Sequence, residues 1–265
     1  MIHLLDATVA YGTHTVFSGV DISIERGLIH AIVGPTGCGK TSLLMLMAGL
    51  LKPVTGSVVF DIEKDRNHVA LIPQDYGLFP WKTVRGNVLM GLEIAAARRG
   101  VFSSVPAAAK AKTDRLLQEL RIHKLRDRWP LTLSGGQKQR TAIARALAVD
   151  PVLLLMDEPF SALDADIREE MQNLLMELPS TWGATPVIVT HDIGEALRVA
   201  DRLILFRLED KAAAFANARE SRKQYTAPFI VECFGNDKAE KAEMEQRVRA
   251  ALRNARDKDS AKESP

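Results

Sequence analysis

The sequence predicts an α/β fold in which a mainly parallel sheet is joined by an N-terminal antiparallel β-layer and an inserted helical subdomain. Two observations lead to this prediction. Short, continuous runs of apolar and β-branched residues alternate with helical patterns, which is typical of parallel strands buried between helices. One early segment instead alternates polar and apolar residues, which is typical of a half-exposed strand. The continuous runs are 28–33, 69–72, 152–156, 187–190 and 203–206.

The first 25 or so residues differ from the rest because they alternate. Residues 20–25 read VDISIE, so the valine and isoleucine side chains would face one side of an extended chain and the polar side chains the other. We therefore expect an antiparallel strand here, in a small β-layer beside the α/β core.

Helical patterns dominate two later stretches. Between Tyr76 and Val149 the strand signals disappear and Ala, Leu, Arg and Lys, which favour helix, predominate. We interpret this stretch as a helical subdomain inserted into the core. A further amphipathic helix is expected after Asp166, and we expect Pro179 to end it. Its apolar positions are Ile167, Met171, Leu174, Leu175 and Leu178.

The composition is that of a folded protein from a reducing compartment. Of 265 residues, 46% are hydrophobic, which excludes wholesale disorder, and the formal charge of +2 gives no reason to expect a nucleic-acid partner. Cys38 and Cys233 have no metal-ligand spacing. The N-terminus lacks the features of a secretory signal, and the longest apolar or small run, 43–51, is half of the roughly 18 residues that a membrane span needs. We expect a cytosolic chain.

A glycine-rich loop at residues 34–41 satisfies the pattern GxxxxGK[ST], directly after one expected strand and before an expected helix. Its glycines let backbone N–H groups surround a phosphate, and the positive end of the helix dipole adds to the attraction. Lys40 would contact the β- and γ-phosphates of a nucleotide, and the Thr41 hydroxyl is an oxygen ligand suited to Mg²⁺. The candidate nucleotide-binding residues here are Gly34, Pro35, Thr36, Gly37, Cys38, Gly39, Lys40, Thr41 and Ser42.

The simpler interpretation of this loop is a glycine-rich turn that binds nothing, but such a turn would not need a strand before it and a helix after it. Cys38 would be reactive if the helix N-terminus lowered its thiol pKa, but the interpretation that we favour is a small side chain at a variable position. The loop therefore predicts a P-loop NTPase core.

Two adjacent carboxylates, Asp157 and Glu158, follow the expected strand 152–156, in the pattern known as Walker B. The carboxyl edge of a parallel sheet is where α/β folds bind ligands. Asp157 is placed to hold the metal hydration shell, and Glu158 to orient or deprotonate an attacking water. An acidic pair after a strand is often only a helix cap, but here the pair lies 117 residues after Lys40 in the order that a nucleotide site requires.

Residues 133–140, LSGGQKQR, lead into a strong helical pattern, and Ser134–Gln137 at its start predict a second phosphate-binding surface. Ser134 is a natural N-cap, and Gly135 and Gly136 leave N–H groups open at the positive end of the helix. Gln137 completes the motif. LSGGQ, lying between the phosphate loop and the carboxylate pair, resembles the signature of ATP-binding cassette (ABC) ATPases, and the resemblance extends over roughly residues 3–207.

This resemblance implies roles for four further residues. Gln74 resembles the glutamine that contacts the metal, His191 the histidine that hydrogen-bonds the γ-phosphate, and Asp164 a residue expected at a subunit interface. Tyr11 lies where an aromatic residue stacks on adenine. Each alone has a simpler explanation, because a single Gln or His after a strand is often structural and a single Tyr often packs. The resemblance also implies an ABC ATPase domain at 1–235, in which the helical subdomain lies at about 76–149. The many charged side chains of residues 236–265 indicate a charged tail.

The resemblance further implies partners. Two copies would close head to tail, each signature motif meeting the other copy's ATP. Separate permease subunits would span the membrane, and this chain would lie against its inner face. The stretch FPWKTVRGNV resembles importers of the nitrate, sulfonate and taurine group, which implies a periplasmic or extracellular solute-binding protein and a small anion as cargo. There Tyr76, Phe79 and Trp81 would anchor a permease helix, unless they only pack the subdomain. An ABC exporter subunit and a non-transport ABC ATPase are the alternatives.

Overall fold

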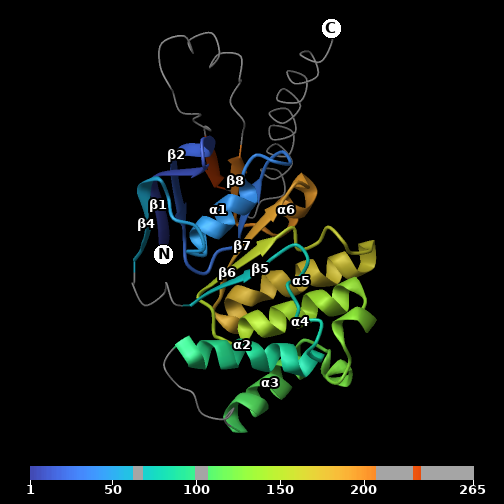
Figure 1. Ribbon diagram of the computed structural model, residues 1–265. Coiled ribbons are helices and arrows are strands. Elements are labelled where there is room, and N and C mark those ends of the chain that lie inside the picture. The colour runs from blue at the N-terminus through green and yellow to red at the C-terminus, as the bar shows by residue number, and fades with distance from the viewer. Residues whose placement is uncertain (62–67, 99–106, 207–228, 234–265) are drawn as a thin grey trace, which may run out of the picture. The chain divides into compact units, whose positions relative to one another are not determined.

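The computed structural model describes residues 1–61, 68–98 and 107–206, and the backbone of 229–233. The chain divides into two compact units, which are coloured by residue number in Figure 1. Unit 1 comprises Met1–Arg66 and Val187–Pro265, and unit 2 comprises Asn67–Pro186. The predicted tail at 236–265 lies outside the described residues.

Unit 1 contains the predicted antiparallel β-layer. Strands β1 (Ile2–Tyr11), β2 (His14–Ile24) and β4 (Thr55–Phe60) form a three-stranded sheet in the order β2-β1-β4, with both pairs antiparallel. The alternation expected in residues 20–25 is present, since Ile22 and Ile24 are buried and Asp21 and Ser23 are exposed. The antiparallel layer is therefore confirmed.

The parallel part of unit 1 leads directly into the phosphate loop. Strand β3 (His30–Val33) pairs in parallel with β8 (Arg202–Phe206) and with residues 187–190 of β7 (Thr185–Thr190), and β9 (Phe229–Cys233) pairs antiparallel with β8. All four residues of β3 are buried, as a strand covered on both faces requires. Helices α1 (Lys40–Met47) and α6 (Ile193–Val199) complete the described part of the unit.

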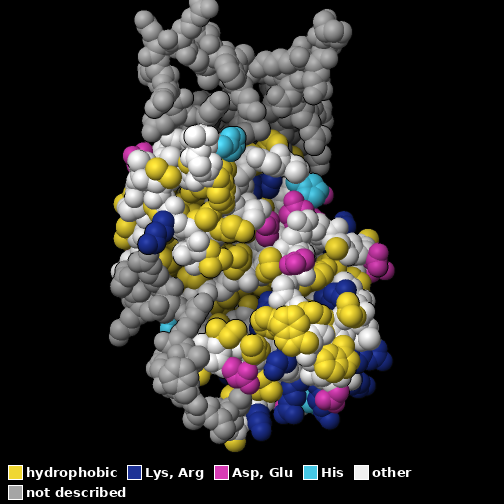
Figure 2. Space-filling model, viewed as in Figure 1, with side chains coloured by type: hydrophobic (Ala, Val, Ile, Leu, Met, Phe, Trp, Pro, Cys, Tyr) yellow, Lys and Arg dark blue, Asp and Glu magenta, His cyan; other side chains and the backbone are white. Residues whose placement is uncertain are grey.

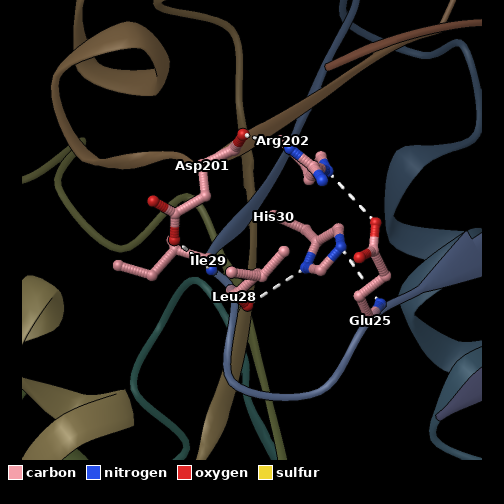
Figure 3. A network of polar contacts seen from close by, with 6 residues as sticks. All are labelled: Glu25, Leu28, Ile29, His30, Asp201 and Arg202. Carbon is pink, nitrogen blue, oxygen red and sulfur yellow. Dashed lines mark hydrogen bonds and ion pairs between the residues drawn. The ribbon is translucent and has the colours of Figure 1, made fainter. Parts of the chain in front are cut away.

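Strand β3 begins two residues later than the apolar run predicts, because a turn precedes it. Gly27 has φ 77°, and the imidazole of His30 folds back on this turn (Figure 3). Its Nε2 accepts the Glu25 N–H at 3.2 Å, so Nδ1 carries the proton and donates to the Leu28 carbonyl at 3.1 Å. Arg202 Nε in turn donates to the Glu25 carboxylate at 3.1 Å. These contacts fix the start of the strand that carries the phosphate loop.

Unit 2 combines two parallel strands with four helices. Strand β5 (Val69–Ile72) pairs in parallel with β6 (Leu153–Asp157), in the register Val69 to Leu153. Between them lie α2 (Val84–Arg98), α3 (Ala107–Glu119), α4 (Gly135–Leu147) and two short 3-10 helices, η2 (His123–Leu125) and η3 (Pro130–Thr132). The described residues between 76 and 149 contain no strand, in agreement with the helical pattern.

Helix α5 (Ala165–Trp182) corrects one prediction, since Pro179 does not end it. A proline in the last turn removes only its own N–H from the helix, and its carbonyl still accepts the Gly183 N–H at 3.1 Å. The helix ends instead at Gly183, which adopts the left-handed conformation with φ 66°. The expected apolar face is present, with Met171, Leu175 and Leu178 buried. Among the described residues, no helix is long and apolar enough to span a bilayer.

Candidate nucleotide-binding site

The phosphate loop of unit 1 connects β3 to α1 through close approaches that only glycine permits. A Cβ on Gly34 would lie 2.6 Å from the carbonyl oxygen of Phe206, which is backbone of the paired strand β8. A Cβ on Gly39 would lie 2.5 Å from a methyl carbon of Val16, and Gly39 has φ 102°. The glycines that the motif requires are therefore required by the packing around the loop as well.

Lys40, the first residue of α1, turns its ammonium group back into the loop. Its Nζ donates to the Gly34 carbonyl at 2.9 Å and to the Pro35 carbonyl at 2.7 Å, and the side chain is only 6% exposed. A lysine ammonium is a compact point charge with three donors, which a phosphate can attract from neutral carbonyls. The loop thus holds one buried positive charge where the motif predicts the β- and γ-phosphates.

Cys38 has the environment of a packed side chain rather than of a nucleophile. It is buried, its Sγ lies 4.0 Å from Lys40 Nζ, and burial raises the pKa of its thiol. The ammonium of Lys40 acts in the opposite direction but is the smaller effect. These observations favour the interpretation of Cys38 as a small filler of the loop.

Tyr11 lies beside the first turn of α1. It ends β1 with half of its surface exposed, and its hydroxyl is 3.3 Å from the hydroxyl oxygen of Ser42 in that turn. Thr36, Gly37 and Thr41 are exposed. The Tyr11 ring is therefore tied at its hydroxyl to the helix that follows the phosphate loop, while much of the ring remains accessible for stacking.

His191 lies exposed directly after β7, between two hydrogen-bonded neighbours. The Thr190 hydroxyl donates to the Glu195 carboxylate at 2.8 Å and accepts the Asp192 N–H at 3.1 Å. Asp192 also caps α6 by accepting the Glu195 N–H at 3.1 Å. The backbone on both sides of His191 is thus fixed by a cap that the sequence analysis did not consider.

In unit 2, the structure brings Gln74 and Glu158 together across 84 residues of sequence. Gln74 Nε2 donates to Glu158 Oε2 at 3.3 Å. Glu158 has φ 45°, an uncommon conformation outside glycine, and its carbonyl accepts the Ser161 hydroxyl at 3.0 Å. The preceding Asp157 is the last residue of β6 and is half-buried. Helix α5 begins only at Ala165, so the acidic pair does not cap it.

The motif at Ser134–Gln137 opens helix α4 with a capping box. The Ser134 hydroxyl accepts the Gln137 N–H at 3.4 Å, and the Gln137 side chain accepts the Ser134 N–H at 3.1 Å. A Cβ on Gly136 would lie 2.4 Å from the Cγ2 methyl of Ile167 in α5. The N-terminus of α4 is therefore ordered by its own side chains and packed closely against α5.

Asp164 occupies the N-cap position of α5, but its carboxylate makes no capping hydrogen bond there. It is exposed, and Ala162, two residues earlier, packs on the signature motif, since a Cβ on Gly135 would lie 3.0 Å from its carbonyl oxygen. The segment leading to Asp164 thus lies against the signature motif within the same unit.

The three aromatic residues expected to anchor a permease helix differ in exposure. Trp81 is 65% exposed, whereas Tyr76 and Phe79 are half-buried and pack within unit 2. Two polar residues that the sequence analysis missed hold this segment: Asn87 of α2 and Arg145 of α4. The only sequence signal for either was a polar residue on a mainly apolar helical stretch.

A family model and several known proteins are similar to this chain. The family model described as "ABC transporter" matches residues 17–161, which include the phosphate loop, Gln74, the signature motif and the carboxylate pair. The "Sulfate/thiosulfate import ATP-binding protein CysA" of Mycobacterium tuberculosis is 43% identical over 204 residues, 75% of this chain and 56% of the relative. The "Spermidine/putrescine import ATP-binding protein PotA" of Chromobacterium violaceum is 36% identical over 88% of this chain and 65% of the relative. The chain thus spans less than two thirds of these curated relatives.

Among solved structures, the dimeric post-hydrolysis state of the ATP-binding cassette MJ0796, bound to ADP and Pi, superposes with a TM-score of 0.65 at 30% identity, covering 77% of this chain and 94% of that one. The expected likeness to the nitrate, sulfonate and taurine group is not confirmed, because these relatives are named for sulfate and polyamine import. The family itself is established by a model that matches more than half of the chain. This chain belongs to the ABC transporter family.

Proposed function

We propose that this chain is the ATP-hydrolysing subunit of an ABC importer. The observation that carries the proposal is the capped N-terminus of α4, because a signature motif ordered in this way presents helix N–H groups that fit a phosphate. The phosphate loop with its buried Lys40 supplies the complementary half of such a site. Import is supported by the names of both curated relatives.

Binding of ATP follows from the groups of unit 1. The N–H groups of the loop surround the phosphates, and Lys40 exchanges the carbonyls of Gly34 and Pro35 for the β- and γ-phosphate oxygens. Tyr11 stacks on the adenine, and His191, exposed at the end of β7, donates a hydrogen bond to the γ-phosphate. These contacts position the terminal phosphoryl group for attack by water.

The residues proposed to hold Mg²⁺ fit that ion by their chemistry. Thr41, Asp157 and Gln74 offer a hydroxyl, a carboxylate and an amide oxygen, which are the hard oxygen ligands that Mg²⁺ prefers. Gln74 uses its Nε2 on Glu158, so its oxygen remains the group suited to a cation. When bound, Mg²⁺ would neutralise charge on the phosphates.

Hydrolysis is assigned to Glu158, whose carboxylate orients the attacking water and accepts its proton. The hydrogen bond from Gln74 Nε2 holds the Oε2 atom of this carboxylate in place. Stabilisation of the transferring phosphoryl group comes from Lys40 and from the signature N–H groups of a second copy. Two copies therefore assemble head to tail, with Asp164 at their interface.

The proposed partners are transmembrane permease subunits and a solute-binding protein outside the membrane, with this chain at the inner face. Figure 2 shows hydrophobic side chains beside Lys and Arg side chains over the helical part of unit 2. Exposed Trp81 belongs to this unit, and so do Trp129 and Leu131, which are 49% and 83% exposed. Large exposed apolar side chains of this kind are suited to a docked permease helix. Trp81 is the proposed anchor.

The proposed cargo is an oxyanion of the sulfate type, which keeps the anion class expected from the sequence and agrees with the more similar of the two curated relatives. A polyamine is the second candidate, because the other relative carries that name. ATPase activity of the complete transporter, measured with sulfate, thiosulfate, nitrate, taurine and spermidine, separates these classes. Stimulation from the outer face supports import, whereas stimulation from the cytosolic face would support an exporter.

The ATPase assignment is tested with Glu158→Gln, which keeps the shape of the side chain and removes the proton acceptor. We expect ATP turnover to fall by a factor of about 100 or more, since general-base catalysis contributes about that much. We also expect the variant to form a dimer with ATP, measured by light scattering after size exclusion. Lys40→Ala, which loses a phosphate contact, should remain monomeric with ATP. A Glu158→Gln variant that stays monomeric while binding ATP would contradict the head-to-tail mechanism.

A further inference from the structure

Arg145, near the end of α4, contacts the segment that follows Gln74. Its guanidinium donates to the Tyr76 carbonyl at 3.0 Å and to the neighbouring Gly77 carbonyl. The same guanidinium lies 5.5 Å from the centre of the Phe79 ring, and that ring lies 5.5 Å from the ring of Trp81. A continuous line of contacts therefore joins α4 to the exposed Trp81.

The start of α4 contacts the same segment. Tyr76 has φ 67°, and its hydroxyl oxygen lies 3.5 Å from the point where a Cβ on Gly135 would be. Gly135 is the first residue of α4 and belongs to the signature motif. The segment after Gln74 is thus held at both ends of α4, by Gly135 and by Arg145.

Asn87 of α2 fixes the remainder of this loop. It is fully buried, and its side-chain oxygen accepts the Phe79 N–H at 2.8 Å. Its amide nitrogen, which carries two hydrogens, lies 3.1, 3.1 and 3.0 Å from the carbonyl oxygens of Phe79, Lys82 and Thr83 and donates among them. A buried amide with all of these partners satisfied allows one conformation of the loop, so a displacement at Tyr76 is passed on to Trp81 rather than absorbed.

We infer that Arg145 is a positioning residue that couples the nucleotide-contacting Gln74 and the signature motif to the exposed Trp81. Burial lowers the pKa of Arg145, and the nearby Asp75 carboxylate acts in the opposite direction. Because burial removes water from the guanidinium, the Tyr76 and Gly77 carbonyls provide the hydrogen-bond acceptors that water would otherwise supply. Separating the loop from α4 would leave a half-buried charge without these acceptors. The loop and the helix therefore move as one body, and ATP contacts at Gln74 and Ser134–Gln137 reach Trp81 through this link.

The inference rests on the proposed function, because it requires that ATP binds near Gln74. The test uses the full chain with Trp129→Phe and Trp182→Phe, which leaves Trp81 as the single tryptophan of the three. Binding of the non-hydrolysable analogue AMP-PNP is measured by calorimetry, and the exposure of Trp81 is measured by acrylamide quenching with and without the analogue. We expect the analogue to change the quenching constant of Trp81.

Arg145→Gln should retain analogue binding within about threefold but reduce the change in the Trp81 quenching constant about fivefold, the size of a modest coupling between sites. Arg145→Lys keeps the charge but lacks a planar guanidinium that can donate to two carbonyls at once, so it should recover part of the change in the Trp81 quenching constant. If the glutamine variant does not fold, the test is made on the lysine variant alone. A change in its Trp81 quenching constant as large as that of the parent overturns the inference. Arg140→Gln is the matched control, because Arg140 is also on α4 but contacts Glu170 and the Leu120 carbonyl instead.

The outcomes separate the two proposals. If the parent chain does not bind the analogue, the proposed function fails. If the parent binds the analogue but Trp81 does not respond, or if Arg145→Gln responds as fully as the parent, the proposed function stands and the inference about Arg145 is overturned. A loss of response in Arg140→Gln equal to that in Arg145→Gln would also overturn it, since the effect would then be general to α4.

Discussion

The two units hold their candidate residues by different physical means. In unit 1 the phosphate loop is shaped by backbone, because Gly34 approaches the backbone of Phe206 and Lys40 donates to carbonyls of its own loop. In unit 2 the arrangement depends on side chains, such as Gln74 on Glu158 and Arg145 on the segment after Gln74. A site shaped by backbone permits few substitutions. In a site held by side chains, the effect of one substitution can be compensated by a second substitution at the side chain that it contacts.

The largest expected effect is that of Gly34→Ala, where the added Cβ would lie 2.6 Å from a backbone oxygen of β8. Strand β8 is paired along its length and cannot move away from the added Cβ. We therefore expect the free energy of unfolding to fall by about 3 kcal/mol, the upper part of the usual range for overpacking, and ATP binding to be lost. Urea unfolding measures the stability, and calorimetry measures the binding. The control is Gly37→Ala, at φ 79° with open space around the added Cβ, which should cost about 1 kcal/mol for the backbone conformation alone. Equal stability of the two variants would contradict the backbone argument.

The second prediction concerns the polar contacts at the start of β3. Burial lowers the pKa of His30 from 6.5 to about 4. Between these two pH values the imidazole is therefore protonated in the unfolded chain and neutral in the folded chain. The contribution of His30 is therefore fully present above pH 6.5 and is lost as pH falls through 4, by about 3 kcal/mol at most. Urea unfolding between pH 7 and pH 4 measures the slope.

His30→Gln should be less stable than the parent at pH 7 but should lose less stability as the pH falls, because it has no imidazole to protonate. An identical slope in the two proteins would show that other groups carry the acid sensitivity. Since His30 opens the strand that leads to the phosphate loop, this result also measures how much of unit 1 depends on its buried polar contacts.

A smaller effect is expected in unit 2, where the Cβ of Gly136→Ala would lie 2.4 Å from the Cγ2 methyl of Ile167. We expect a loss of about 2 kcal/mol. Unlike the contact at Gly34, this one is with a side chain, so Ile167→Leu, which has no methyl at that branch, should restore much of the loss. A double-mutant cycle in urea measures the coupling, which should be at least about 1 kcal/mol. Additive effects of the two substitutions would remove the distinction drawn between the units.

The phosphate loop and the parallel strands were predictable because their signals are local. Glycine at 34 and 39 and lysine at 40 are needed by a backbone conformation that spans eight residues, and the buried β3 is apolar after its first residue, His30. The same locality explains the error at Pro179, since the sequence rule for proline took no account of how little a helix loses in its last turn.

The contacts made by Asn87 and Arg145 were not predictable. Arg145 acts on carbonyls 68 and 69 residues earlier in the chain, and a carbonyl leaves no mark in the sequence because every residue has one. The hydrogen bonds of the Asn87 side chain are likewise all to backbone groups. Sequence motifs therefore identified the residues proposed to touch ATP, while those that hold them in place required the structure.

The smallest expected effect is that of Cys38→Ser, at a loop position where the side chain is buried and its sulfur lies 4.0 Å from Lys40 Nζ. Serine has nearly the same size, and its hydroxyl can donate within the loop, so ATP turnover should stay within about threefold of the parent, less than about 1 kcal/mol in the barrier. Because burial raises the pKa of the thiol, iodoacetamide at pH 7 should modify Cys38 slowly in the folded chain and readily in urea. The measurement is made on Cys233→Ser, so that one thiol remains. An inactive serine variant, or fast alkylation of the folded protein, would mean that the thiol takes part in the chemistry, and the loop of unit 1 would then depend on a side chain as unit 2 does.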